Sequence, residues 1–223
     1  MDEYTNIMSQ LNIGFDRIKP TLYSFVKRLF DIAVSSMGLI FAMCAAGVIF
    51  VINLASGDCV CLIYSQKRIG LNGKPFTLYK FRTMLPDSDK MFDELLKDEN
   101  ISAEWAAAQK LRNDPRITRN GRLLRATGLD ELPQFLNVLK GEMSLVGPRP
   151  LVEGELEMHG GDDRYHSVRP GLTGWWACNG RSELSYSKRL ELEYYYIDNR
   201  SVALDIKCIF RTFCSVFFRH DGV

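Results

Sequence analysis

The chain has 223 residues, with 28 Lys and Arg against 27 Asp and Glu, and 46% of its residues are hydrophobic. This length allows one well-filled core together with a membrane element. A formal net charge of +1 excludes the strongly basic balance of most nucleic-acid-binding proteins, and three histidines without a CxxC pair exclude a zinc site of the usual spacing.

An uncharged apolar segment lies between Asp31 and Asp58. It exceeds the roughly 20 residues that a membrane-spanning helix needs and has no polar face, although a buried core helix is the alternative. Basic residues flank both ends, so the positive-inside rule keeps both ends cytoplasmic. We therefore expect a re-entrant helix that enters the bilayer, bends near Gly47 and returns. The side chains available to pair the freed backbone groups are Ser35, Ser36 and Asn53.

The rest of the chain predicts a sequence of short elements. Residues 60–84 predict a β-hairpin, because Asn72-Gly73 is the strongest short turn signal. Helical spacing with start and stop signals predicts helices over 87–112, 119–126, 131–140 and 184–198, and residues 147–150 predict an extended segment.

Residues 203–219 predict an amphipathic helix lying on the membrane surface, with a packed terminal helix as the alternative. The predicted fold class is α+β and mainly helical. It comprises a re-entrant membrane helix, a β-hairpin and a compact helical catalytic domain with interfacial amphipathic helices. We place the N-terminal segment and membrane helix at 1–58, and the cytoplasmic catalytic domain with its C-terminal interfacial helix at 59–223.

Asp130 and Glu131 are adjacent carboxylates that follow a run of six basic residues from Lys110 to Arg125. Nearby guanidinium groups favour the charged form of a carboxyl, so we expect Asp130 to be ionised. An ionised Asp can attack phosphorus, and its Glu neighbour can hold a divalent metal. Arg149 lies between two prolines, which pre-orient its guanidinium for a phosphate.

Three alternatives apply to these residues. The sequence Thr127-x-x-Asp130 resembles a helix capping box, in which Asp130 would only cap the next helix. The basic run is also compatible with a solvated surface. A membrane-tethered nucleic-acid site is the third alternative, but a local basic patch on a near-neutral protein favours a small anionic ligand.

Four stretches carry a resemblance to a known family: KRLFDI, YKFRTM, DPRITRNGRLLRATGLDELPQFLNVLKGEMSLVGPRP and VRPGLTGWWACNGR. They resemble the bacterial sugar transferases, the monotopic polyprenol-phosphate phosphoglycosyl transferases, in their short form. The resemblance covers about residues 27–210. The family usually breaks its membrane helix at a Ser-Pro pair, whereas residues 43–47 of this chain contain no proline.

The resemblance implies an enzyme that transfers a sugar-1-phosphate from a UDP-sugar to undecaprenyl phosphate and releases UMP. This would be the first membrane step of surface polysaccharide or glycoconjugate synthesis. Asp130 would form a covalent phosphosugar intermediate, and Glu131 would bind the Mg²⁺ cofactor. The residues expected near the substrate phosphates are Lys80, Arg125, Arg149, Arg181 and Glu193.

The implied partners are the UDP-sugar, undecaprenyl phosphate and the lipid bilayer, with no nucleic acid and with a homodimer left open. The implied location is the bacterial inner (cytoplasmic) membrane, with the active site on the cytoplasmic face. A non-catalytic, membrane-anchored scaffold of a glycan assembly complex is the alternative function. A scaffold, however, would need neither Asp130 nor Glu131.

Overall fold

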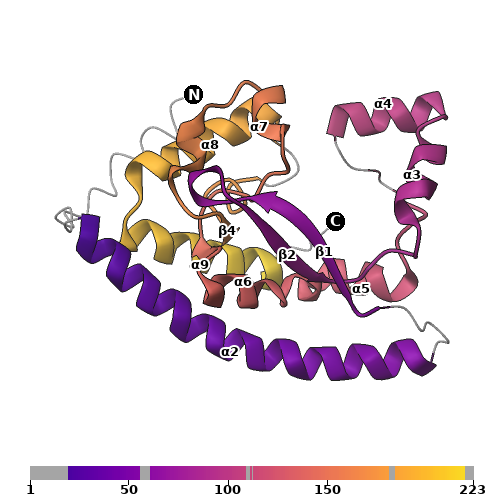
Figure 1. Ribbon diagram of the computed structural model, residues 1–223, viewed down its shortest axis with the longest axis horizontal. Coiled ribbons are helices and arrows are strands. Elements are labelled where there is room, and N and C mark those ends of the chain that lie inside the picture. Colours follow the sequence, from indigo (N-terminus) through magenta and orange to yellow (C-terminus); the bar gives the residue numbers. More distant parts are fainter. Residues whose placement is uncertain (1–19, 56–60, 109–110, 112, 181–183, 219–223) are drawn as a thin grey trace.

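The computed structural model describes residues 20–55, 61–108, 111, 113–180 and 184–218 (Figure 1). The helices are α2 (Pro20–Ala55), α3 (Ser88–Leu95), α4 (Glu99–Ala108), α5 (Arg119–Thr127), α6 (Gln134–Lys140), α7 (Glu155–Met158), α8 (Tyr186–Asn199) and α9 (Val202–Phe218). The strands are β1 (Ile63–Ile69), β2 (Pro75–Phe81), β3 (Ser144–Val146) and β4 (Gly171–Thr173). The short 3₁₀ turns are η1 (Leu71–Gly73), η2 (Leu129–Glu131) and η3 (Asp163–Ser167). A mainly helical α+β fold with a long N-terminal apolar helix and a hairpin is therefore confirmed.

Helix α2 is continuous over 36 residues, so the predicted break within the membrane helix is wrong. At a rise of 1.5 Å per residue the helix is about 54 Å long. No proline follows Pro20 in the helix, and no neighbouring atom lies within 4 Å of the place where Gly47 would carry a Cβ. The Ser36 hydroxyl donates to the Ile32 carbonyl of the same helix at 2.8 Å. An unbroken helix satisfies its own backbone groups, which is what a lipid environment favours.

One face of α2 packs against the rest of the protein along the helix. The residues buried on this face recur at helical spacing and are Tyr23, Asp31, Ser35, Ala42 and Ile49. A Cβ on Gly38 would lie 2.5 Å from the Phe135 ring, so the contact with α6 needs a glycine there. Figure 1 shows α2 running beneath α6 and the hairpin.

The opposite face of α2 is apolar and exposed. Its large exposed side chains include Leu22, Phe25, Leu29, Ile40, Phe41, Val48, Phe50, Val51 and Leu54. The helix has a window of mean hydropathy 2.4, of which only 17% is buried. The core-helix alternative is therefore wrong, and the helix is long and apolar enough for a membrane.

Strands β1 and β2 form the predicted antiparallel hairpin, in a register that pairs Tyr64 with Lys80 and Arg68 with Phe76. Its turn has Asn72 and Gly73 at φ 56° and 72°. Both values lie in the left-handed region that Asn and Gly adopt most readily, which is why this dipeptide turns the chain here.

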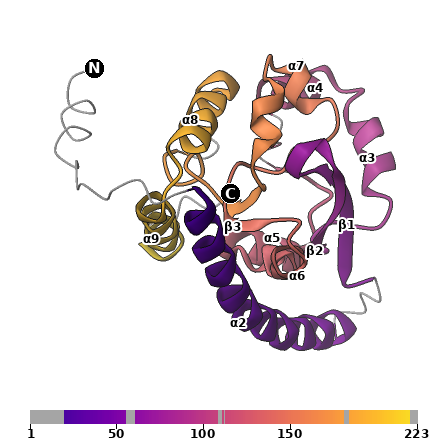
Figure 2. The same ribbon diagram turned by 60° about the vertical axis from the view of Figure 1, so that its left-hand side comes forward.

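The core lies between the hairpin, the parallel pair β3–β4 and helices α6, α8 and α9. Its most buried side chains include Leu78, Val138, Met143, Val146, Tyr196 and Cys208. Tyr196 is 1% exposed, and its hydroxyl donates to Asp205 at 2.6 Å. The Lys27 ammonium pairs with the same carboxylate at 2.8 Å, so this network joins α2 to α9. Figure 2 shows α9 beside the beginning of α2.

Two predicted helices have different boundaries in the structure. The helix expected over 131–140 begins at Gln134, because Pro133 occupies the position before its first turn. The helix expected over 87–112 is divided into α3 and α4.

Helix α9 has features of both predicted alternatives, a packed terminal helix and an amphipathic helix with an exposed apolar face. Asp205 and Cys208 are buried against the core, whereas Ile206, Phe210 and Phe213 form an exposed apolar row at helical spacing. The helix is thus packed on one face and apolar on the other.

Candidate active site

Asp130 and Glu131 lie in η2, a tight turn between α5 and α6. Helix α5 ends at Gly128, whose φ of 70° is left-handed and suits glycine. Pro133 precedes α6, and no side chain caps the amino end of that helix. The Thr127 hydroxyl instead donates to carbonyls of α5 at 2.8 and 3.1 Å. The capping-box interpretation is therefore wrong.

The Asp130 carboxyl is nearly buried, with 8% of the residue exposed. Burial is the largest influence and raises the pKa of Asp130 above its ordinary value, against the lowering effects of Lys80 and Arg125. The expected stabilisation of the carboxylate by cations is present, but desolvation outweighs it. A partly desolvated carboxylate is also a stronger nucleophile than one fully hydrated in water.

Glu131 points toward the hairpin, where the Lys80 ammonium lies 2.7 Å from its Oε1 atom. Both side chains are partly exposed, at 41% for Glu131 and 31% for Lys80, so a solvent-borne ligand can reach them. Within the described residues no group of three or more Asp, Glu, His or Cys side chains gathers to hold a metal. Magnesium is often held by one or two carboxylates with substrate phosphates and waters, so the partly exposed Glu131 fits such an ion.

Arg125 is fixed beside this pair by the end of the hairpin. Its Nε donates to the hydroxyl of the buried Thr83 at 2.9 Å. The Thr83 carbonyl accepts the Thr118 amide at 3.0 Å, which holds the start of α5 against the same strand end. The positive charge of Arg125 is one of the influences that lower the pKa of Asp130 against the effect of burial.

Arg149 has a fixed backbone and an exposed side chain. Its amide donates to Glu193 Oε1 at 2.9 Å, and its carbonyl accepts the Tyr165 hydroxyl at 3.0 Å. Glu193 is completely buried, and burial raises its pKa to about 8. Glu193 thus contacts the Arg149 backbone, and its predicted phosphate role is an expectation that the structure leaves open.

Two further arginines near Arg149 were missed by sequence reasoning. Arg68 and Arg189 lie on the same Glu155 carboxylate, at 3.8 and 3.9 Å, and the Arg68 Nη1 donates to the Pro150 carbonyl, next to Arg149, at 3.1 Å. Arg189 also lies over the Trp176 ring, 4.6 Å from its centroid. The sequence pattern of β1 could have predicted a place for Arg68 in the site. Side chains two and four positions apart share one face of a strand, so Arg68 lies on the same face as Tyr64, which is paired with Lys80.

The predicted site residues thus form two groups. The first group lies at η2 and consists of Asp130, Glu131, Lys80 and Arg125. The second cluster lies around Arg149 and consists of Arg149, Glu193, Arg68 and Arg189. Four residues of β1, about 13 Å of strand, connect the two. Arg181 lies outside the described residues.

The basic run does not form one exposed surface. Arg116 is 7% exposed, pairs with Asp114 at 2.6 Å and lies 4.3 Å from the Phe92 ring centroid. Arg125 lies beside the Asp130–Glu131 turn, where it is hydrogen-bonded to Thr83. Lys110 and Arg112 lie outside the described residues.

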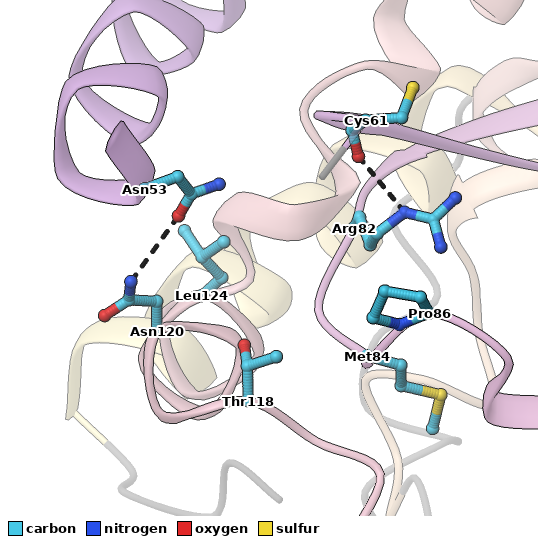
Figure 3. A pocket seen from close by; sticks show the side chains of 8 residues that line it. All are labelled: Asn53, Cys61, Arg82, Met84, Pro86, Thr118, Asn120 and Leu124. Carbon is cyan, nitrogen blue, oxygen red and sulfur yellow. Dashed lines mark hydrogen bonds between the residues drawn. The ribbon is translucent and has the colours of Figure 1, made fainter. Parts of the chain in front are cut away.

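A small polar pocket lies where the end of α2, the hairpin ends and α5 meet (Figure 3). Asn120 donates to Asn53 at 3.4 Å, and the Arg82 Nε donates to the Cys61 carbonyl at 3.1 Å. A cavity of about 10 Å³ has room for no more than one water, so no nucleotide fits here. The surface at η2 is the better place for a large substrate.

Comparison with known proteins identifies the family. The bacterial sugar transferase family matches residues 22–219. The chain is 45% identical over 200 residues to the undecaprenyl-phosphate galactose phosphotransferase of Salmonella typhimurium (89% of this chain, 41% of that protein). It is 40% identical over 192 residues to exopolysaccharide production protein ExoY of Sinorhizobium fredii (85% and 84%). It is 44% identical over 190 residues to the uncharacterized sugar transferase EpsL of Bacillus subtilis (82% and 83%).

The chain therefore spans about two fifths of the length of some relatives and most of the length of others. The family match covers nearly every described element, from α2 to α9. This chain belongs to the bacterial sugar transferase family.

Proposed function

We propose that the protein transfers a sugar-1-phosphate from a UDP-sugar to undecaprenyl phosphate, in surface polysaccharide synthesis. The observation that carries the proposal is the η2 turn, where a nearly buried Asp130 lies beside the Lys80–Glu131 pair and Arg125. One relative is named as an undecaprenyl-phosphate galactose phosphotransferase and another as an exopolysaccharide production protein, which supports this substrate class.

The chemistry runs in two displacements at one phosphorus atom. An Asp130 carboxylate oxygen bonds to the β-phosphorus of the UDP-sugar, and the bond from that phosphorus to the bridging oxygen breaks, so UMP leaves with the electron pair. A phosphate oxygen of undecaprenyl phosphate then attacks the same phosphorus. The aspartyl oxygen leaves as a carboxylate, which regenerates Asp130 and yields the lipid diphosphate sugar.

The cationic side chains oppose the charge that develops on the diphosphate. Arg125 presents a guanidinium held by Thr83, and Lys80 extends from strand β2 to pair with Glu131. Glu131 would hold Mg²⁺, which neutralises phosphate charge when bound.

We further propose that α2 lies along the cytoplasmic face of the bacterial inner membrane, with both ends on that side. The catalytic elements contact one face of α2 from Lys27 to Asn53. A helix perpendicular to the membrane would therefore carry the catalytic elements into the lipid. The exposed apolar faces of α2 and α9 supply the lipid-facing surface.

The test of the reaction is UMP release from a panel of UDP-sugars with Mg²⁺, with and without undecaprenyl phosphate. We expect multiple turnovers only with the lipid, and none in an Asp130→Asn variant that still folds. If folded wild-type protein in lipid releases no UMP from any donor, the scaffold alternative becomes the better account.

An epitope at the N-terminus tests the topology. It should resist externally added protease in intact spheroplasts and become accessible only after permeabilisation. Cleavage without permeabilisation would show a full membrane span and contradict the proposed orientation.

A further inference from the structure

We propose that Arg28 is a positioning residue that sets the height of the Asp130–Glu131 turn relative to the bilayer, through helix α6. This inference rests on the proposed function, because it concerns how the site meets its lipid substrate. It assigns to a residue of the membrane helix a role in the transfer of the phosphosugar to the lipid.

The first observation is a two-pronged cap. The Arg28 Nη1 donates to the Val138 carbonyl at 2.6 Å, and Nη2 donates to the Leu139 carbonyl at 2.7 Å. These carbonyls belong to the last turn of α6, whose end carries partial negative charge, and the Val138 carbonyl also accepts the Gly141 amide at 3.0 Å. A guanidinium fork satisfies two such acceptors with one charge, which an ammonium cannot do in the same geometry.

The second observation is the short connection from that cap to the catalytic turn. Helix α6 has only seven residues, so its two ends are about 10 Å apart. Only Leu132 and Pro133 separate its amino end from η2. A movement of the capped end is therefore transmitted to Asp130, because a helix of two turns has little freedom to bend.

The third observation is that the same part of α2 holds the segment after α6. The buried Asp31 accepts the Ser144 hydroxyl at 3.1 Å and the Leu145 amide at 3.0 Å. Asp31 lies one turn beyond Arg28 on α2, so one face of α2 is hydrogen-bonded to both α6 and β3. The depth of α2 in the lipid thus determines the depth of the catalytic turn.

The two displacements should depend differently on this depth. The UDP-sugar arrives from water and can approach Asp130 at any height above the lipid. The phosphate of undecaprenyl phosphate is tied to the bilayer surface, so it meets Asp130 only where the heights agree. A misplacement of about 1 Å can slow a reaction by about 100-fold.

The experiment compares Arg28→Lys with Arg169→Lys. Both keep the positive charge, and so the topology signal. Arg169 caps the same end of α6, with Nε donating to the Gly141 carbonyl at 2.8 Å, but it is not part of the membrane helix. Each protein is reconstituted in phosphatidylethanolamine and phosphatidylglycerol vesicles, and melting midpoints establish that the variants are folded.

Two rates are measured by rapid quench. The first is the burst of UMP without lipid acceptor, and the second is the discharge of a radiolabelled phosphosugar from the enzyme onto undecaprenyl phosphate. For Arg28→Lys we expect the burst to stay within about twofold of wild type and the discharge to fall at least about 10-fold. For Arg169→Lys both rates should stay within about twofold of wild type.

Three outcomes would overturn the positioning role. An unchanged discharge in Arg28→Lys means that the cap does not set the height, and equal losses of burst and discharge mean a structural role alone. A loss of discharge in both variants means that the transfer to lipid depends on the stability of the α6 end and not on its link to the membrane helix. Absence of a burst in the wild-type protein would instead refute the proposed reaction itself.

Discussion

The Asn137 side chain pairs with the backbone of β2 where a third strand would lie, so replacing it should lower the free energy of unfolding. The residue is fully buried in α6, and its Oδ1 accepts the Tyr79 amide at 3.2 Å. Its Nδ2 donates to the Thr77 carbonyl and to Glu142, both at 2.7 Å. One side chain thus pairs two backbone groups of β2, as the peptide group of a neighbouring strand would.

The Asn137→Ala change leaves those two backbone groups without their partner. A buried group that loses its hydrogen bond costs about 1–3 kcal/mol, and Glu142 can turn to water, so we expect a loss of about 3 kcal/mol. For a chain of this size that corresponds to a fall of about 6–12 °C in the melting midpoint.

The assay is thermal unfolding in lipid nanodiscs, followed by tryptophan fluorescence. The matched control is Asn199→Ala, which removes an exposed amide that donates to a carbonyl of its own helix at 2.9 Å. This control should change stability by no more than about 0.5 kcal/mol. If Asn137→Ala melts within about 2 °C of wild type, the amide does not bridge α6 and β2 as described.

Three further predictions concern charge and packing. Lys80→Met should raise the pKa of Asp130, because the ammonium lowers it, and the acidic limb of the UMP-release profile should move to higher pH; an unmoved limb would contradict this coupling. Glu193 has a folded pKa of about 8, above its ordinary value of 4.5, so its contribution favours the folded state most at low pH and is lost as pH rises through 8. Glu193→Gln should therefore melt with a weaker pH dependence than wild type between pH 5 and 9, and parallel curves would refute the assignment. Gly38→Ala should lower the stability by about 1–3 kcal/mol, because the added methyl group overpacks the contact with α6. Gly47→Ala has open space around it and should stabilise the protein by about 0.5–1 kcal/mol. Equal melting midpoints for the two variants would show that α2 does not pack closely at Gly38.

Local chemistry explains which parts of the fold the sequence predicts. The Asn72-Gly73 turn and the position of Asp130 and Glu131 follow from short-range signals, and Arg125 lies on the adjacent helix. The continuous α2 was not predicted, because flanking charge alone suggested a break that no proline supplies. The sign of the Asp130 pKa shift also depends on burial, which spacing does not reveal.

The second cluster depends on tertiary structure. Arg68 and Arg149 are 81 positions apart in the sequence, and only the folding of the hairpin against the Arg149 turn brings them together. Glu193 reaches the same turn from α8. No periodicity connects these residues, so the sequence predicts a phosphate role for Arg149 but does not predict which residues are its neighbours.

The anchors of α2 have a consequence for biosynthesis. Arg28 finds its carbonyl partners 110 and 111 positions later, and Tyr23 finds Asp205 182 positions later. The helix leaves the ribosome before these partners are made, so we expect its polar side chains in the proposed membrane position to reach first toward the water at the bilayer surface. On the proposed membrane position of α2, we expect membrane association to come before tertiary folding, with the lipid surface as the template on which α6, β3 and α9 assemble.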